Sequence, residues 1–369
     1  MRVAILGSRG VPAVYGGFEI FAENLGVGLV EGGCEVTVYC PRNQSYRENQ
    51  YRGIYLRFVW HPPGGAGTLL YDALSLADVT FSRFDVVLML GYGAGPLLVL
   101  PRLSGRAVFV NTDGLEWSRA KWPWYVSVWL RFAEACAVHL ATALVSDSMQ
   151  IQGYFERTYG MRSTYIPYGA PMPINIGEDR LQNLGLSRRG YYLAAMRLEP
   201  ENSVEEIVEG FLMARTEKPL IIVGSETPFF RARILPRIKD TVKVRWLGPL
   251  ELMSEEGRAQ LLQLRGHAYA YVHGHTAGGT SPSLLQAMGL GTLVLAIENA
   301  STEEVTREAA LFFKDASHLS SLIVQLEATS EADRSARRER LRQTIYDRYR
   351  WEVIVDKYLA LFRMVCDAR

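Results

Sequence analysis

The sequence predicts an α/β protein built from two doubly wound parallel sheets in tandem, and three observations lead to this prediction. Short apolar runs alternate with helix-length amphipathic segments, which is the pattern of parallel sheets covered by helices on both faces. The alternation stops once, near residue 175, and then restarts. The length of 369 residues suits two domains of roughly 100–200 residues each.

The first domain is expected to span residues 1–175 and to open with a strand, because "VAIL" lies within the first ten residues. Its clearest helix is the segment 18–30, between the first two strands. The strands predicted from apolar runs are 3–6, 36–39, 55–59, 86–89, 107–110, 143–145 and 164–166.

The boundary between the domains is expected in "IPYGAPMPINIGEDRLQNLGLSRRG", which is rich in Pro and Gly and shows little periodicity. A second domain, 185–345, follows. Its predicted strands are 191–195, 220–223, 243–246, 268–272 and 292–296, with helices such as 204–214 and 258–264 between them. The last predicted helix, 351–369, contains the amphipathic "WEVIVDKYLALF", which must dock its apolar face.

Composition excludes several classes of protein. With 48% hydrophobic and 21% charged residues, the chain reads as a soluble globular protein. A net charge of +1 argues against a nucleic-acid binder. The four cysteines are scattered without metal-ligand spacing, as in a cytoplasmic protein with buried thiols. The first apolar run is too short for a signal peptide and is expected to be a strand. No uninterrupted apolar run of about 18 residues is found, so no spanning helix is expected.

Ligands of doubly wound sheets bind beyond the carboxyl ends of the strands, near helix N-termini. The first such loop, "GSRGVPAVYGGFE", places Gly16 and Gly17 at the start of a helix. Paired glycines there let a diphosphate or a sugar approach the backbone N–H groups. Arg9 and Tyr15 can contact a polar ligand. The G-x-G-x-x-G spacing of a nicotinamide site is absent, and a plain flexible loop is the alternative.

The second loop, "NTDGLEWSRAKW", concentrates acids, cations and indoles in twelve residues after the fifth predicted strand. Asp113 and Glu116 are candidates for orienting a hydroxyl nucleophile. Trp117 can stack on a sugar ring, and Lys121 is a further candidate acceptor contact. The alternative is an Asp-Gly turn with a local hydrogen bond.

The third loop, "AMRLEPENSVEE", follows the first strand of the second domain. Arg197 is expected to point beyond the strand end, where a guanidinium can pair bidentately with a phosphate. A salt bridge from Arg197 to Glu199 or Glu201 is the alternative.

The fourth loop, "HGHTAGGTSPSLLQAMGLG", runs from a strand end into a helix. Backbone N–H groups and hydroxyls at a helix N-terminus favour a diphosphate. Gln286, one to two turns into the helix, can bond the hydroxyls of a ribose. The remaining candidate donor contacts in this loop are His273, His275, Gly279, Thr280 and Ser281.

The phrase "GTSPSLLQAMGLGTLVLA" resembles the donor region of the GT-B glycosyltransferases of retaining family 4. "YGGFE", "NTDGLEWSRAKW", "RLEPEN" and "HGHTAGGTSPSLLQAM", in this order, resemble its rhamnosyltransferase-like branch. The resemblance covers essentially the whole chain. It implies two Rossmann-like domains facing a cleft, an N-terminal acceptor domain, a C-terminal nucleotide-sugar domain and a last helix that crosses back to the first domain.

The chain departs from the family pattern at three places. Gly278 and Gln286 stand where the family commonly has Glu-x7-Glu. Asn202 replaces the Lys of the Arg-x4-Lys pair that begins at Arg197, and is still expected to contact the donor. Thr112–Asp113 stands where many members have His. No carboxylate in the donor loops suits a covalent nucleophile, so Arg197 and the loop amides are expected to act by positioning and electrostatic stabilisation.

The resemblance implies transfer of rhamnose or another hexose, with retention, from a dTDP-, UDP- or GDP-linked donor. The acceptor would be a saccharide on a lipid carrier, in cell-surface polysaccharide synthesis. No metal and no cofactor is expected. "AKWPWYVSVWLRFAEACAVHL" can rest on the inner face of a membrane or form a core helix. A nucleotide-sugar epimerase of the same fold and a non-catalytic sugar-binding protein remain as alternatives.

Overall fold

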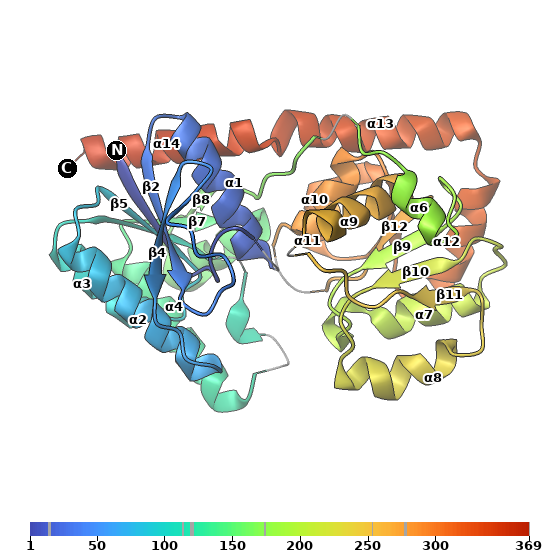
Figure 1. Cartoon of the computed structure of the whole chain (residues 1–369), viewed down its shortest axis with the longest axis horizontal. Coiled ribbons are helices and arrows are strands. Elements are labelled where there is room, and N and C mark those ends of the chain that lie inside the picture. The colour runs from blue at the N-terminus through green and yellow to red at the C-terminus, as the bar shows by residue number, and fades with distance from the viewer. Residues whose placement is uncertain are drawn as a thin grey trace. The chain divides into compact units, whose positions relative to one another are not determined.

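The computed structural model describes residues 1–13, 16–112, 114–118, 122–172, 175–252, 254–276 and 279–368, arranged as two compact α/β units (Figure 1). The first unit comprises Met1–Gly169, Gly278–Thr280 and Trp351–Arg369. The second comprises Ala170–Ala277 and Ser281–Arg350.

The first unit is built on one eight-stranded sheet. Its strands are β1 (Arg2–Leu6), β2 (Glu35–Pro41), β3 (Gln50–Tyr51), β4 (Ile54–Val59), β5 (Val86–Leu90), β6 (Ala107–Asn111), β7 (Ala143–Ser146) and β8 (Thr164–Tyr165). They lie in the order β3-β4-β2-β1-β5-β6-β7-β8, and all neighbours are parallel except β3 and β4. The strand order reverses between β1 and β5, which is the topological switch point of this doubly wound sheet.

Helices cover both faces of this sheet, because its central strands are apolar on both sides. Every residue of β5 and β6 is buried. The helices are α1 (Gly17–Glu31), α2 (Gly65–Phe81), α3 (Val99–Leu103), α4 (Trp124–Leu140), α5 (Met149–Tyr159) and α14 (Trp351–Asp367).

The last helix, α14, belongs to the first unit and packs on α1 (Figure 1). A Cβ at Gly28 of α1 would overlap the side chain of Val355, so the two helices approach closely where α1 has no side chain. The Phe362 ring lies 4.7 Å from that of Phe109 in β6. The apolar face of "WEVIVDKYLALF" is therefore buried in the first unit.

The second unit holds a six-stranded, fully parallel sheet. Its strands are β9 (Tyr192–Ala195), β10 (Leu220–Val223), β11 (Val244–Trp246), β12 (Ala270–His273), β13 (Leu293–Ile297) and β14 (Leu311–Phe313). Their order is β11-β10-β9-β12-β13-β14. The switch point lies between β9 and β12, so the loops that leave these two strands are neighbours.

The helices of the second unit are α6 (Asp179–Asn183), α7 (Val204–Met213), α8 (Leu235–Ile238), α9 (Glu255–His267), α10 (Pro282–Gly289), α11 (Ala300–Thr306), α12 (Ala316–Ala328) and α13 (Glu331–Arg348). The sequence did not predict the short edge strands β3 and β14, nor α6 inside the Pro- and Gly-rich segment. Elements of two to five residues are too short to show a period, so tertiary pairing alone defines them.

Candidate functional sites at the two switch points

The loops after β9 and β12 are held together by backbone contacts. Thr276 donates both its N–H and its hydroxyl to the carbonyl oxygen of Glu201, at 3.1 and 2.8 Å. A Cβ at Gly274 would overlap the carbonyl oxygen of Asn202, so the approach requires glycine. The two loops thus form one surface at the carboxyl edge of the second sheet.

Arg197 and Asn202, two predicted donor contacts, lie in the loop after β9. Asn202 is buried and donates its side-chain amide to the Arg197 carbonyl at 2.7 Å, which places Asn202 in the framework of the loop. Arg197 pairs with Glu201 at 2.7 Å, while its side chain remains 38% exposed. The salt bridge to Glu201, which the sequence offered as an alternative, is therefore present. It engages one nitrogen of the Arg197 guanidinium, which stays accessible.

His273 and His275 stack on each other, with ring centroids 4.4 Å apart and planes 14° from parallel. Burial, followed by the neighbouring His275 and Arg265, holds the pKa of His273 well below its usual range. His273 is therefore a neutral imidazole at pH 7, able to make hydrogen bonds without carrying charge.

Asn299 links this loop to the next strand of the sheet and was not predicted from the sequence. Its Nδ2 donates to the carbonyl oxygen of His275 at 2.8 Å, and its Oδ1 accepts from the N–H of Thr302 at 2.9 Å, which caps α11. An Asn a few residues after a predicted strand is a possible helix N-cap, and this signal could have identified it.

Gln286 lies in the second turn of α10, as expected, but its side chain has a partner within the protein. Its Oε1 accepts a hydrogen bond from Nη1 of Arg265. Arg265 is only 4% exposed, and its guanidinium lies 5.6 Å from the ring centroid of Tyr271. Burial lowers the pKa of Arg265, so Gln286 satisfies a cation held in an unfavourable environment.

The start of α10 presents backbone N–H groups that have no partner within the helix, and such groups bind anions. Ser281 is its N-cap residue and makes no side-chain capping hydrogen bond, and Pro282 follows as the first helical residue. The first helical hydrogen bond from this cap reaches Leu285, so the N–H groups of Ser283 and Leu284 precede the helical ladder.

Gly279 and Thr280 group with the first unit, where they contact Asp147 after β7. Thr280 donates its N–H to Oδ2 of Asp147 at 2.7 Å and its hydroxyl to the Asp147 carbonyl. A Cβ at Gly279 would overlap the Asp147 carboxylate. Both donors of Thr280 are thus engaged by a residue that the sequence analysis did not single out, although "SDS" directly after a predicted strand was a detectable signal.

The loop after β1 is held to α1 by two carboxylates of that helix, buried Glu19 and half-buried Glu23. Glu19 accepts from the N–H of exposed Arg9 at 3.3 Å, and Glu23 accepts from the N–H of Ala13 at 2.6 Å. Gly16 caps α1 with φ of 120°, and Gly17 is its first residue. Burial raises the pKa of Glu19, and backbone hydrogen bonds oppose that rise. Glu19 thus connects the glycine-rich loop after β1 to α1. Its burial could not be predicted from the spacing of residues in the sequence.

The loop after β6 is organised by Tyr92, which follows β5. The Tyr92 hydroxyl accepts from the N–H of Glu116 at 2.7 Å and donates to the carbonyl of Gly114 at 3.4 Å. The Glu116 carboxylate accepts from the indole N–H of Trp122 at 3.0 Å. Glu116 is therefore positioned at the loop by both its backbone and its side chain.

Trp117 is half-buried, with its indole edge fixed. Its N–H donates to Glu134 at 3.0 Å, and the guanidinium of Arg131 lies 3.9 Å from the centroid of its ring. Glu134, 1% exposed, also accepts from the hydroxyls of Tyr154 and Tyr159. Arg131 covers one face of the indole, so a sugar would have to stack on the other. The remaining predicted residues of these loops, Tyr15, Asp113 and Lys121, lie outside the described residues.

The described residues hold neither a cluster of metal ligands nor a helix that could span a membrane. Nowhere in those parts of the chain do three His, Cys, Asp or Glu side chains gather as a metal ion would require. None of the helices described there combines the length and the apolar character needed to cross a bilayer.

Comparisons with known proteins identify the fold. Residues 1–171 match a family model described as "Domain of unknown function (DUF1972)". No curated protein matches the sequence. Sucrose-phosphate synthase from Thermosynechococcus elongatus is similar over 100% of both chains, with 17% identity and a TM-score of 0.81. A glycosyltransferase from Rickettsia africae ESF-5 is similar over 100% of this chain and 99% of its own, with 13% identity and a TM-score of 0.77.

Anabaena HepE, solved in complex with UDP and glucose, is similar over 99% of this chain and 100% of its own. It shares 16% identity, with a TM-score of 0.73. At 13–17% identity, these similarities establish the fold and not the activity. The chain has the GT-B fold, with two doubly wound parallel sheets, as the sequence predicted.

Proposed function

We propose that the protein is a glycosyltransferase that moves a hexose from a nucleotide-diphosphate donor to a saccharide acceptor, with retention of configuration. One observation carries the proposal: at the switch point of the second sheet, the Arg197 loop and the loop leading to α10 form one surface. The HepE structure, solved with UDP and glucose, supports a nucleotide-sugar donor. The four sequence motifs alone support the rhamnosyltransferase-like branch of family 4.

The proposed donor lies along this edge of the second unit. Its diphosphate meets Arg197 and the uncapped N–H groups at the start of α10, where the helix dipole favours negative charge. The ribose hydroxyls meet the side-chain amide of Gln286. His273 and His275 lie at the end of β12, near the proposed sugar position, and the neutral His273 adds no competing charge.

The proposed transfer takes place on one face of the sugar. The bond between the anomeric carbon and the diphosphate oxygen breaks through an oxocarbenium-like state. The acceptor hydroxyl forms the new bond on the same face, and its proton passes to the departing diphosphate. The protein contributes positioning and stabilisation of the diphosphate charge. Asp113 and Glu116, in the loop after β6, would orient the acceptor hydroxyl.

The direct test supplies the purified protein with UDP-, GDP- and dTDP-linked hexoses, with and without a lipid-linked saccharide. Release of nucleoside diphosphate that depends on the acceptor supports the proposal. Interconversion of the sugar nucleotide without an acceptor would identify an epimerase. Donor binding without turnover across all donors and acceptors would indicate a sugar-binding protein.

Arg197→Ala is expected to weaken donor binding about tenfold or more, because one charged hydrogen bond to the diphosphate is lost. Calorimetric titration with the free nucleoside diphosphate measures the change. Glu201→Gln is the matched variant, since it removes the competing carboxylate 2.7 Å from Arg197 and should preserve or raise affinity. Equal affinity in wild type and Arg197→Ala would reject the phosphate role.

Asp113→Asn is expected to slow transfer about tenfold while nucleotide affinity stays unchanged, because the loop after β6 belongs to the proposed acceptor side. Steady-state rates at saturating donor, compared with nucleotide binding by calorimetry, separate the two effects. A wild-type transfer rate in a folded variant would reduce Asp113 to a turn residue.

The exposed face of α4 supports a peripheral membrane contact on the acceptor side. The helix buries one face, while the other exposes Trp124 (78%), Tyr125 (61%), Val128 (59%), Trp129 (39%) and Phe132 (54%). Large aromatic side chains of this kind partition into the membrane–water interface. We propose that this face, the α4 aromatic face, rests on the membrane that holds the lipid-linked acceptor.

The double change Trp124→Ser and Trp129→Ser is expected to reduce co-sedimentation with phospholipid vesicles about tenfold or more, because two interfacial side chains are lost. Met364→Ser on α14 is the control, since it removes another exposed apolar side chain (63%) outside that face. Equal vesicle binding by the double variant and the wild type would contradict the assignment.

A further inference from the structure

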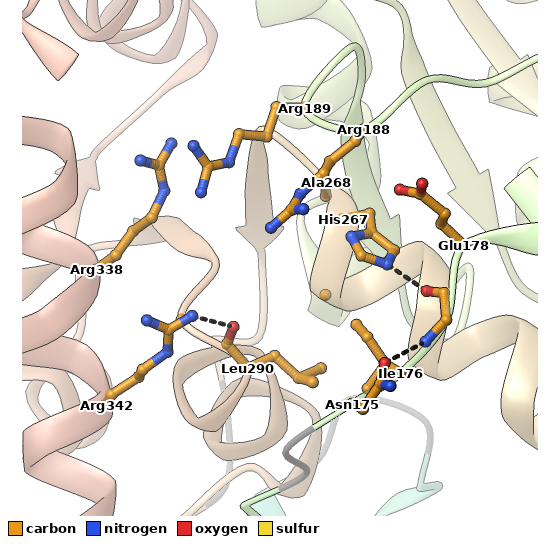
Figure 2. A pocket seen from close by; sticks show the side chains of 13 residues that line it. Asn175, Ile176, Glu178, Arg188, Arg189, His267, Ala268, Leu290, Arg338 and Arg342 are labelled. Carbon is orange, nitrogen blue, oxygen red and sulfur yellow. Dashed lines mark hydrogen bonds between the residues drawn. The ribbon is translucent and has the colours of Figure 1, made fainter.

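A cavity of about 370 Å³ lies at the other end of the second sheet, at the amino ends of its strands. Arg188 and Arg189 lie just before β9, His267 lies just before β12, and Arg338 and Arg342 project from α13 (Figure 2). The four residues of β9 separate this cavity from the Arg197 loop by about 13 Å at ~3.3 Å per residue. The cavity is therefore distinct from the proposed donor position.

The cavity is lined by four guanidinium groups and one carboxylate, Glu178. Figure 2 shows the guanidinium groups of Arg189 and Arg338 facing each other. Exposed Glu331 pairs with both of them, at 3.0 and 2.8 Å. This shared carboxylate does not neutralise two cations, so positive charge remains in the wall.

Arg338 is the buried cation of this group, only 5% exposed. Its Nη1 bonds Glu331, but its Nη2 has no hydrogen-bond acceptor among the residues that the structure describes. A buried charged donor without a partner is unfavourable unless a ligand supplies the acceptor. Burial lowers the pKa of Arg189, and Arg338, Arg188 and Arg342 lower it further, which reflects repulsion among these cations.

His267 adds a second buried polar atom. Its Nε2 bonds the carbonyl of Gly177, which can only accept, so the proton resides on Nε2. Its Nδ1 is buried and has no partner in the described parts of the chain. This nitrogen can therefore accept a hydrogen bond from a ligand hydroxyl.

The backbone at Gly291 leaves room for the side chain of Arg342. Gly291, after α10, has φ of +69°, and a Cβ there would overlap the guanidinium of Arg342. Arg342 also donates to the carbonyl of Leu290 at 3.3 Å, which orients it along the wall (Figure 2). A glycine at this position lets the arginine lie flat against the chain.

We propose that this cavity, the arginine pocket, binds a small phosphorylated ligand as a second anion site of the protein. Guanidinium groups match phosphate oxygens in bidentate geometry. The volume lies within the range of small-molecule sites, about 300–1,000 Å³. The Nδ1 of His267, which has no partner among the described residues, suits a ligand that also carries hydroxyls, such as a sugar phosphate or a phospholipid headgroup.

Calorimetric titration of the full chain with inorganic pyrophosphate tests the site. Arg188→Gln and Arg342→Gln are expected to weaken binding about tenfold or more each. Arg340→Gln is the matched control, because it removes an exposed arginine from the same helix, outside the cavity wall. Arg197→Ala should retain the pocket's binding, which distinguishes it from any pyrophosphate bound at the proposed donor edge.

Vesicles distinguish the two sources of phosphate. A lipid headgroup would be supported if Arg342→Gln loses binding to phosphatidylglycerol vesicles while Arg340→Gln keeps it, and if the two variants do not differ on phosphatidylcholine vesicles. Unchanged vesicle binding with weakened pyrophosphate binding would support a soluble phosphate. The inference fails if Arg188→Gln and Arg342→Gln match Arg340→Gln in both measurements. Thermal melts confirm that each variant is folded, which is expected because Arg188 and Arg342 are exposed.

Discussion

Gln286→Leu is expected to lower nucleotide affinity by roughly 5- to 150-fold, because ribose hydroxyls would lose their partner. The variant should also lose about 1–3 kcal/mol of unfolding free energy, since the buried Arg265 loses the oxygen that accepts from its Nη1. Calorimetry with the free nucleotide and denaturant unfolding measure the two effects separately.

Gln286→Glu separates the two roles of this residue. A carboxylate accepts from Arg265 and turns an amide contact into a buried ion pair, so unfolding free energy should be preserved or raised. Nucleotide affinity should also be preserved, because a carboxylate can accept from ribose hydroxyls. Equal dissociation constants for wild type and Gln286→Leu would remove the ribose role and leave Gln286 as the partner of Arg265.

The unfolding free energy is expected to fall by about 3 kcal/mol between pH 4 and pH 7 because of one carboxyl group in α2, Asp72. Burial raises its pKa from 3.8 to about 7, and each pKa unit corresponds to ~1.36 kcal/mol. Between these values the folded state binds the proton and the unfolded state does not. The stabilisation is therefore complete below pH 3.8 and is lost as the pH rises through about 7.

Asp72→Asn should remove this fall, so the variant should exceed the wild type in stability at pH 8 and resemble it at pH 4. Oδ1 of Asp72 has no hydrogen-bond partner among the described residues, so the amide removes a buried charge at little loss of contacts. Denaturant unfolding at the two pH values gives the comparison. Asp240→Asn, at an exposed position, controls for net charge. Parallel stability curves for wild type and Asp72→Asn would contradict the assignment.

Much of the architecture follows from local patterns. Each longer strand of both sheets was predicted within a few residues, because parallel strands buried on both faces read as continuous apolar runs. Arg197 was placed at the carboxyl edge of the second sheet because it follows a predicted strand, and Gln286 was placed in the helix that begins beside that edge. A residue that directly follows a parallel strand must lie at that edge, whatever its partners are.

The partners of these residues depend on contacts between segments far apart in the chain. Spacing alone left Arg197 with two possible glutamates, and the fold pairs it with Glu201. Gln286 meets Arg265, and Thr280 meets Asp147, 133 residues away.

The arginine pocket combines residues before β9, before β12 and on α13, and no motif contains them together. The sequence by itself determined where the longer strands lie along the chain and which loops carry polar groups. Both depend only on residues that are neighbours in the sequence. Only the tertiary structure decided burial, ion pairing and cavity shape, because these depend on which distant side chains exclude water from one another.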